Sequence, residues 1–257
     1  VLRENRPGIA YPLMRGVRAA RFPLIATLDA DCIPVRGWAE AMVSALKSAD
    51  LAVGETLSVP GQTVWEKASY EIFHQHSRRA ALASSAPLPW GPACNLGFHR
   101  KWVKMSGGFD PAAAGAFDVD FCWRAVLSGA RLVWAPRARV LHRRRSTAEA
   151  LERQFYRYGA ALPWLTRRYQ KILELDEETP LDLAVNAGRR VLGLSHRSHR
   201  SEVAVAALAY ACGAWVAKRG ATPLDPEKYP RPGWWIDSAG RRASIVAGRG
   251  IVRYSRR

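Results

Sequence analysis

Long apolar runs are absent from this chain of 257 residues. The longest uncharged apolar run covers residues 203–217, and its fifteen residues fall short of the ~18–20 that a helix needs to cross a bilayer. Two interpretations of this run stay open: a helix buried in a protein core, and a helix that lies in the membrane interface. A bilayer-spanning helix is excluded at this position.

Cysteine is scarce, and its spacing excludes a dense disulfide framework. No two of the four cysteines form a C-x-x-C pair, and long stretches of sequence separate them. Isolated, reduced thiols are expected from this pattern, which favours a cytosolic protein over a secreted one. The four residues are Cys32, Cys94, Cys122 and Cys212.

Acidic residues are few, with 22 Asp and Glu against 39 Lys and Arg, so the net charge is +17. The excess is concentrated late in the chain: residues 1–130 carry +3 and residues 131–257 carry +14. An anionic partner is therefore expected to meet the second part. No DNA- or RNA-binding motif is recognisable, so a nucleic-acid partner is not expected and an anionic membrane surface is favoured.

Predicted strands and helices alternate along the first 142 residues, which is typical of an α/β domain. A helical, basic segment is expected to follow this domain. Strands are predicted over 22–28, 51–59, 95–98, 131–135 and 139–142, and helices over 38–49, 63–83, 118–127, 147–173, 181–193 and 201–218.

The sequence Asp29-Ala30-Asp31 directly follows the predicted strand over 22–28. In open α/β sheets, ligands bind beyond the carboxyl ends of strands, so these two carboxylates could hold a divalent cation. A cation there would neutralise a departing diphosphate. The alternative is a solvated turn or a helix N-cap, and the motif alone does not decide between them.

A second acidic pair, Asp118 and Asp120, opens the predicted helix over 118–127. These carboxylates could stabilise the helix dipole, or one could face a cleft as a general base.

His142 lies at the end of a predicted strand and precedes three arginines. It could be a third metal ligand beside Asp29 and Asp31, or a structural histidine. The arginines could form only a solvated basic stripe.

One more segment, residues 154–159 (QFYRYG), brings together side chains that suit a nucleotide ligand. Arg157 and Tyr158 follow Gln154 by three and four residues, so the three side chains share one side of a helix. Arginine can bind a phosphate and an aromatic ring can stack on a sugar or a base. An amphipathic helix with solvent-reaching arginines is the alternative.

Taken in order, four stretches resemble the family 2 glycosyltransferases with the GT-A fold. They are residues 25–38 (IATLDADCIPVRGW), 91–110 (GPACNLGFHRKWVKMSGGFD), 116–144 (AFDVDFCWRAVLSGARLVWAPRARVLHRR) and 154–159. The resemblance covers roughly residues 1–160. It implies a GT-A-like, Rossmann-like catalytic domain over 1–160, built on a mixed sheet flanked by helices, with a helical, basic C-terminal extension over 161–257.

The resemblance also implies roles for individual residues. Asp118 would be the catalytic base, and a divalent cation, Mn²⁺ or Mg²⁺, would be held by Asp29, Asp31 and His142. The donor diphosphate would be bound by Asp29, Gln154, Arg157 and Tyr158. The acceptor side would be formed by Asn95, Gly107, Gly108, Asp110 and Asp120.

The implied activity is an inverting transfer of a sugar from a nucleotide-sugar donor to an acceptor hydroxyl on a cell-envelope glycan, polysaccharide or lipid-linked acceptor. The implied location is the cytoplasm, with peripheral association at the inner face of the membrane. Two departures from the family pattern motivate alternatives. Phe117 stands where the family usually has a glutamate before the catalytic aspartate, and the resemblance leads us to expect that the usual N-terminal part of the nucleotide-binding half is absent. The chain is then expected to be a truncated enzyme, with a pseudo-enzyme or a basic anion-binding module as alternatives.

Overall fold

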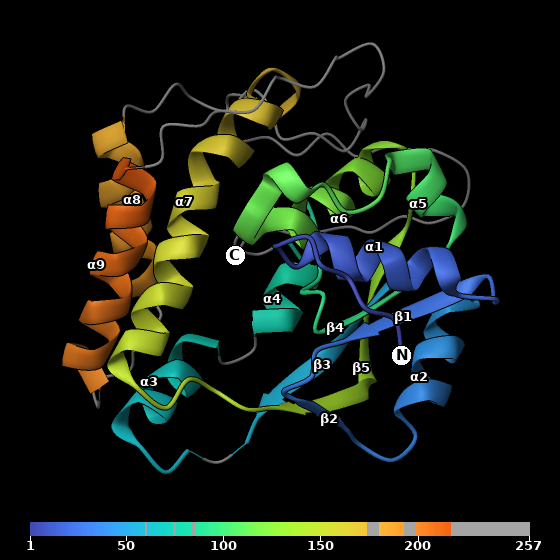
Figure 1. Ribbon diagram of the computed structural model, residues 1–257, viewed down its shortest axis with the longest axis horizontal. Helices are drawn as coiled ribbons and strands as arrows, with labels where there is room; N and C mark the ends of the chain where they lie inside the picture. Colours follow the sequence, from blue (N-terminus) through green and yellow to red (C-terminus); the bar gives the residue numbers. More distant parts are fainter. Residues whose placement is uncertain (60, 74–75, 84–85, 174–179, 193–198, 217–257) are drawn as a thin grey trace, which may run out of the picture.

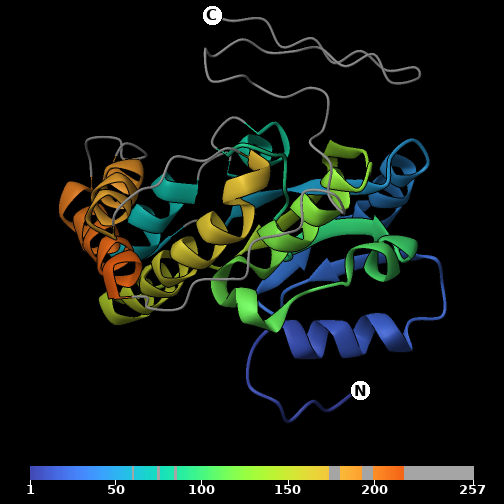
Figure 2. The same cartoon turned by 90° about the horizontal axis from the view of Figure 1, so that it is seen from above.

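The computed structural model describes residues 1–59, 61–73, 76–83, 86–173, 180–192 and 199–216. These residues form a five-stranded mixed sheet with helices on both faces and a group of long helices at one end (Figures 1 and 2). This arrangement confirms the α/β fold class and the mixed sheet flanked by helices. The predicted role of the tail over 222–257, including Trp234 and Trp235, lies outside the described residues.

The strand order in the sheet is β1-β4-β3-β5-β2. Only β3 and β5 are parallel, whereas the other three neighbouring pairs are antiparallel. The strands are β1 (Leu24–Leu28), β2 (Cys32–Pro34), β3 (Leu51–Ser58), β4 (Asn95–His99) and β5 (Leu132–His142).

Side-chain alternation along β3 explains why both faces of the sheet are covered. Leu51 and Val53 are buried in the cluster that includes α6 (Phe117–Leu127) and α1 (Ala10–Ala19). Ala52, between them, points to the opposite cluster, which α2 (Trp38–Leu46) supplies. On β4, a Cβ at Gly97 would lie 2.5 Å from the Met42 sulfur, so glycine allows α2 to approach the sheet closely.

The C-terminal helices pack on one another beside the sheet (Figure 1). They are α7 (Ala148–Leu173), α8 (Pro180–Leu192) and α9 (Arg200–Val216). A Cβ at Gly159 of α7 would lie 1.9 Å from the Tyr210 carbonyl oxygen of α9, so the two helices touch at backbone distance. Residue 160, the predicted domain boundary, falls inside α7.

Helix α9 contains most of the apolar run that the sequence left open. Val203, Ala206 and Ala207 are buried against neighbouring helices, whereas Leu208 and Trp215 are more than half exposed. The run therefore forms a packed helix with one exposed side. Within the part of the chain that the structure describes, no helix is both long and apolar enough to cross a membrane.

The structure corrects several predicted elements. Instead of one helix over 63–83, it has α3 (Val64–Phe73) and α4 (His76–Ala81). The two short strands predicted over 131–142 are one strand, β5. Its pairing with β3 skips residues 136–138, which begin with Pro136, a residue without an N–H to donate.

Two short helices complete the described fold. Helix α5 (Lys101–Ser106) and the 3-10 helix η1 (Pro111–Ala116) precede α6. Helix α1 was not predicted, because Pro12 and Gly16 lower the helix propensity of its sequence. Strand β2 was also missed, since its three residues are too short to show a periodic pattern.

Candidate active site

The Asp29-Ala30-Asp31 motif forms the tight turn between β1 and β2, where the Cys32 N–H donates to the Asp29 carbonyl oxygen at 3.0 Å. Strand β2 then pairs with β5 so that Cys32 lies opposite His142. This register brings His142 beside the turn, and its Nε2 lies 3.5 Å from Asp31 Oδ1. One possible ligand atom each from Asp29, Asp31 and His142 lie within 4.8 Å of one another.

These three side chains fit a divalent cation. Asp31 Oδ1 and His142 Nδ1 are buried without a hydrogen-bond partner among the described residues, which is costly for a polar atom with no ligand. Burial, and then the charge of Arg144, lowers the pKa of His142 to about 4, so the imidazole is neutral and able to bind a metal at pH 7. Two carboxylates and one imidazole are a donor set that Mn²⁺ accepts.

The three arginines after His142 have three different environments. Arg143 is exposed. Arg144 donates from Nε to Ser58 Oγ at 2.6 Å and lies over the Phe73 ring. Arg145 donates to Asp31 Oδ2 at 3.3 Å, so it belongs to the candidate site and not to a solvated stripe.

Asp118 lies in the first turn of α6. Its Oδ2 accepts from the Ala93 N–H at 3.1 Å, and its Oδ1 accepts from the Val119 N–H at 2.9 Å. Burial, with a smaller contribution from the negative charge of Asp29, raises the pKa of Asp118 to about 6. Asp118 therefore lies within electrostatic reach of the Asp29–Asp31–His142 group and has the raised pKa of a general base.

Helix α7 presents the third part of the candidate site. The buried Gln154 donates from Nε2 to Tyr158 Oη at 3.0 Å, one helical turn away. Arg157 is exposed and lines a cavity of about 610 Å³ together with Arg145 and Tyr156. Three arginines and two glutamates border this cavity, and of the arginines Arg145 also contacts Asp31.

Asn95, predicted on the acceptor side, is fully buried, and its side-chain amide has three protein partners. Its Nδ2 donates to the carbonyl oxygens of Glu55 and Ala138, and its Oδ1 accepts from the Trp38 indole. These bonds join β3, β5 and α2 and leave little capacity for a ligand. A role for Asn95 in acceptor binding stays a prediction.

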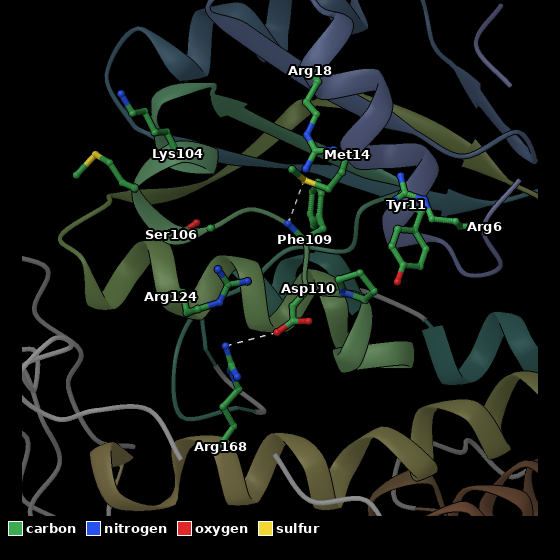
Figure 3. A pocket seen from close by; sticks show the side chains of 13 residues that line it. Arg6, Tyr11, Met14, Arg18, Lys104, Ser106, Phe109, Asp110, Arg124 and Arg168 are labelled. Carbon is green, nitrogen blue, oxygen red and sulfur yellow. Dashed lines mark hydrogen bonds and ion pairs between the residues drawn. The ribbon is translucent and has the colours of Figure 1, made fainter. Parts of the chain in front are cut away.

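Gly107 and Asp110 line a second cavity, of about 450 Å³, on the side of the sheet that α1 covers (Figure 3). Asp110 accepts from the Ala112 N–H at 2.9 Å and lies 3.6 Å from Arg168. Gly107 and Gly108 have φ values of +84° and +75°, which favour glycine and form the turn after α5. This cavity and the Asp29–Asp31–His142 group share no residue.

Asp120 is fully buried and bound by three side chains of the protein. Its Oδ2 accepts from Arg124 Nε at 2.9 Å, and its Oδ1 accepts from Tyr169 Oη at 2.8 Å and is paired with Arg168 Nε at 2.9 Å. Its carboxylate thus joins α6 to α7. The acceptor-side role predicted for Asp120 is untested, and its observed contacts are those of a structural ion-pair cluster.

A model of a known protein family matches residues 24–217 and is described as glycosyl transferase family group 2. Two curated relatives, each named "Pre-mycofactocin glycosyltransferase", come from Mycobacterium tuberculosis strains CDC 1551 / Oshkosh and ATCC 25618 / H37Rv. Each is 29% identical over 168 residues, which make up 62% of this chain and 35% of the relative. The chain thus spans about a third of the length of these relatives.

Two solved structures are similar over much of the chain. The mannosyltransferase PcManGT of Pyrobaculum calidifontis, in complex with GDP-Man and Mn²⁺, matches with a TM-score of 0.45 and 18% identity, over 79% of this chain and 54% of that one. TarS residues 1–349 of S. aureus, in complex with UDP-GlcNAc, matches with a TM-score of 0.41 and 12% identity, over 83% of this chain and 73% of that one.

Proposed function

The chain belongs to glycosyl transferase family group 2, and from this premise we propose that it transfers a sugar from a nucleotide-sugar donor to an acceptor hydroxyl with inversion at the anomeric carbon. The observation that carries the proposal is the convergence of Asp29, Asp31 and His142, with Asp118 in electrostatic reach. A divalent cation held by the first three would supply positive charge to the donor diphosphate.

Asp118 provides the base in this proposal. Its carboxylate takes the proton of the acceptor hydroxyl while that oxygen forms a bond to the anomeric carbon. The bond between the anomeric carbon and the diphosphate oxygen breaks, and its electron pair leaves with the nucleoside diphosphate. The two backbone N–H groups that donate to Asp118 hold the carboxylate in place for this single displacement.

Arg145 and Arg157 bind the leaving diphosphate in this proposal. They line one cavity, and Arg145 links that cavity to Asp31. Guanidinium groups bind phosphate oxygens through charged hydrogen bonds and offset the charge that develops on the leaving group. Gln154 and Tyr158 lie on the same helix and would complete the donor side.

Turnover should depend on pH through Asp118. A base acts only when it is ionised, so with a pKa of about 6 the rate should fall about tenfold per pH unit below pH 6 and level off above it. The measurement is kcat/KM for release of nucleoside diphosphate from UDP- and GDP-sugars at a series of pH values. A flat profile across pH 6 contradicts the assignment.

Asp31→Asn should weaken Mn²⁺ binding by at least about tenfold, because it replaces a charged ligand by a neutral one. Binding is measured from the magnetic resonance signal of free Mn²⁺. Glu40→Gln, which removes an exposed carboxylate in α2, is the matched control and should bind Mn²⁺ normally. Equal affinity in the Asp31 variant and the wild type argues against this cation site.

Arg157→Ala should weaken the binding of UDP or GDP by about 10–100-fold, since it removes one charged hydrogen-bonding group from the diphosphate. Titration calorimetry in the presence of Mn²⁺ measures the change. Arg167→Ala is the control, because Arg167 is an exposed arginine of the same helix that does not line the cavity. If both variants lose affinity equally, the effect comes from net charge alone.

The acceptor and the cellular location are part of the proposal. A glycan or lipid-linked acceptor would suit a basic protein that associates with the inner face of a membrane.

The Phe117 side chain packs in the core against Phe109, so this departure from the family pattern is accommodated by apolar packing. Nucleotide binding without turnover on any acceptor would favour the pseudo-enzyme alternative.

A further inference from the structure

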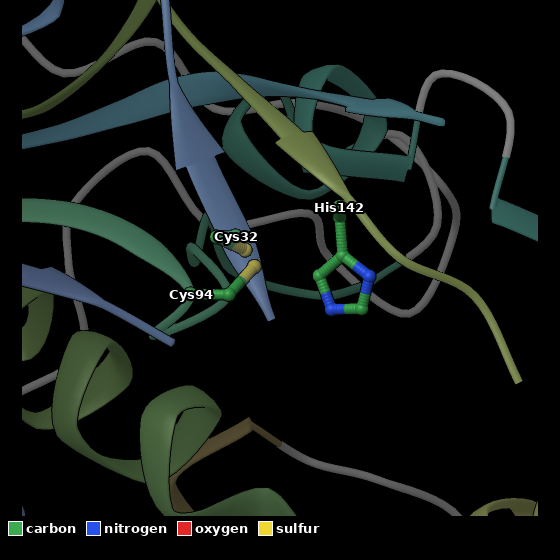
Figure 4. Close-up of side chains that lie close together, drawn as sticks. All are labelled: Cys32, Cys94 and His142. Atoms are coloured by element: carbon green, nitrogen blue, oxygen red, sulfur yellow. The ribbon is translucent and has the colours of Figure 1, made fainter. Parts of the chain in front are cut away.

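Two cysteines lie beside the histidine of the candidate cation site (Figure 4). Cys32, Cys94 and His142 are all buried, and one ligand atom from each lies within 4.8 Å of the others. No step of the proposed reaction uses the two thiols. All four cysteines of the chain are free, so this pair is available for binding.

Backbone pairing holds the three side chains together. Cys32 lies directly opposite His142 in the antiparallel pair β2–β5, which places the two side chains on one face of the sheet. Cys94 immediately precedes β4, whose Asn95 pairs with Leu28 at the end of β1. The Cys94 sulfur lies 3.8 Å from Thr56 Oγ1 and also interacts with the Cys32 thiol.

We propose that Cys32, Cys94 and His142 form a second cation site that takes zinc. Tetrahedral zinc with bonds of about 2.3 Å to sulfur and about 2.0 Å to nitrogen needs ligand atoms about 3.5–3.8 Å apart. The observed limit of 4.8 Å exceeds this by about 1 Å, which small side-chain rotations can close. A water molecule can take the fourth position, or Asp31 can move into it, since its Oδ1 is buried without a hydrogen bond and lies 3.5 Å from His142 Nε2.

The donor set determines which cation binds where. Two thiolates and an imidazole favour zinc strongly over Mn²⁺ and Mg²⁺, whereas Asp29 and Asp31 provide the oxygen ligands that Mn²⁺ and Mg²⁺ accept. Binding of zinc deprotonates the two thiols, and both protons pass to solvent. No oxidant or reductant takes part.

Both sites use His142, and a neutral imidazole binds one metal ion, so zinc and Mn²⁺ compete for this residue. Zinc held by the thiols would therefore displace Mn²⁺ from Asp29 and Asp31. This consequence, inhibition of sugar transfer by zinc, rests on the proposed function. The zinc site itself does not, and it is tested by binding alone.

The direct test titrates the reduced, metal-free chain with Co²⁺ as a spectroscopic substitute for zinc. A thiolate bound to Co²⁺ gives an intense near-ultraviolet charge-transfer band, which oxygen and nitrogen ligands do not give. The expected result is this band at one equivalent of Co²⁺, removed by one equivalent of Zn²⁺. Absence of the band in the wild-type chain overturns the proposal without any variant.

Two variants assign the ligands. Cys32→Ser and Cys94→Ser should each lose the band and weaken zinc binding by at least about 100-fold, while Cys212→Ser, at an exposed cysteine of α9, should change neither. Circular dichroism establishes that each variant is folded. Unchanged zinc affinity in both folded variants would assign zinc to the aspartates and overturn the thiol site.

Mn²⁺ binding separates this inference from the proposed function. Cys94→Ser should keep the Mn²⁺ affinity of the wild type, because Asp29, Asp31 and His142 remain, and it should lose sensitivity to zinc. If zinc binds through the thiols but the chain turns over no nucleotide sugar, the zinc site stands and the proposed function fails. If turnover is normal and the cobalt band is missing, the proposed function stands and the zinc site fails.

Discussion

Asp118→Asn should lower the turnover of a nucleotide sugar by about 10²–10⁴-fold, the contribution of a general base. Asparagine has nearly the same shape but cannot accept the proton of the attacking hydroxyl. Asp118 is not part of the Asp29–Asp31–His142 group, so binding of Mn²⁺ and of nucleoside diphosphate should change by less than about threefold. Transfer rates and calorimetry on the same variant measure both effects.

Glu40→Gln is again the matched control, because it removes one carboxylate from an exposed position of α2. It should transfer sugar at the wild-type rate. Wild-type turnover by Asp118→Asn would exclude Asp118 as the base. Loss of Mn²⁺ binding in that variant would mean that Asp118 acts on the cation site and not on the acceptor.

Asp120→Asn should lower the free energy of unfolding by about 3–5 kcal/mol, because it leaves a buried charge without its partner. The guanidinium of Arg124 is almost fully buried against this carboxylate, and Arg168 and Tyr169 of α7 bind the other carboxylate oxygen. The change therefore loosens the contact between α6 and α7. Chemical denaturation followed by circular dichroism measures the loss.

Glu149→Gln is the control for this second prediction. Glu149 and Arg153 form an ion pair with the same spacing of four residues, but both side chains are largely exposed. An exposed pair contributes less than about 1 kcal/mol, so the control should unfold almost as the wild type does. Similar losses in the two variants would show that burial of the Asp120 cluster has no special effect.

Asp118 and Asp120 show which features of the site the sequence can predict and which it cannot. Their position at the start of a helix was predictable from the pattern, and the pattern also motivates the hypothesis that one of them acts in the site. Two residues along a helix correspond to a rotation of about 200° around its axis, so the two side chains point to nearly opposite sides. Only one of them can therefore face the candidate site. The sequence could not decide which, because Arg168 and Tyr169, which bind Asp120, come from a distant helix.

Arg145 shows a similar limit. A run of three arginines after a strand does not indicate which of them is solvated and which forms an ion pair with Asp31. Arg145 forms the pair because β2 places the turn at Asp29–Asp31 next to the end of β5. Strand β2 has three residues, too few for any periodic signal, yet its register determines the neighbours of His142.

The proposed diphosphate site is tested most directly by calorimetric binding of UDP and GDP to the chain with and without Mn²⁺. Nucleotide binding should require Mn²⁺, should be at least about tenfold weaker in Asp31→Asn and in His142→Ala, and should be kept in Asp118→Asn. Binding of equal strength without Mn²⁺, or unchanged binding in both the Asp31 and His142 variants, would contradict a diphosphate site built on Asp29, Asp31 and His142.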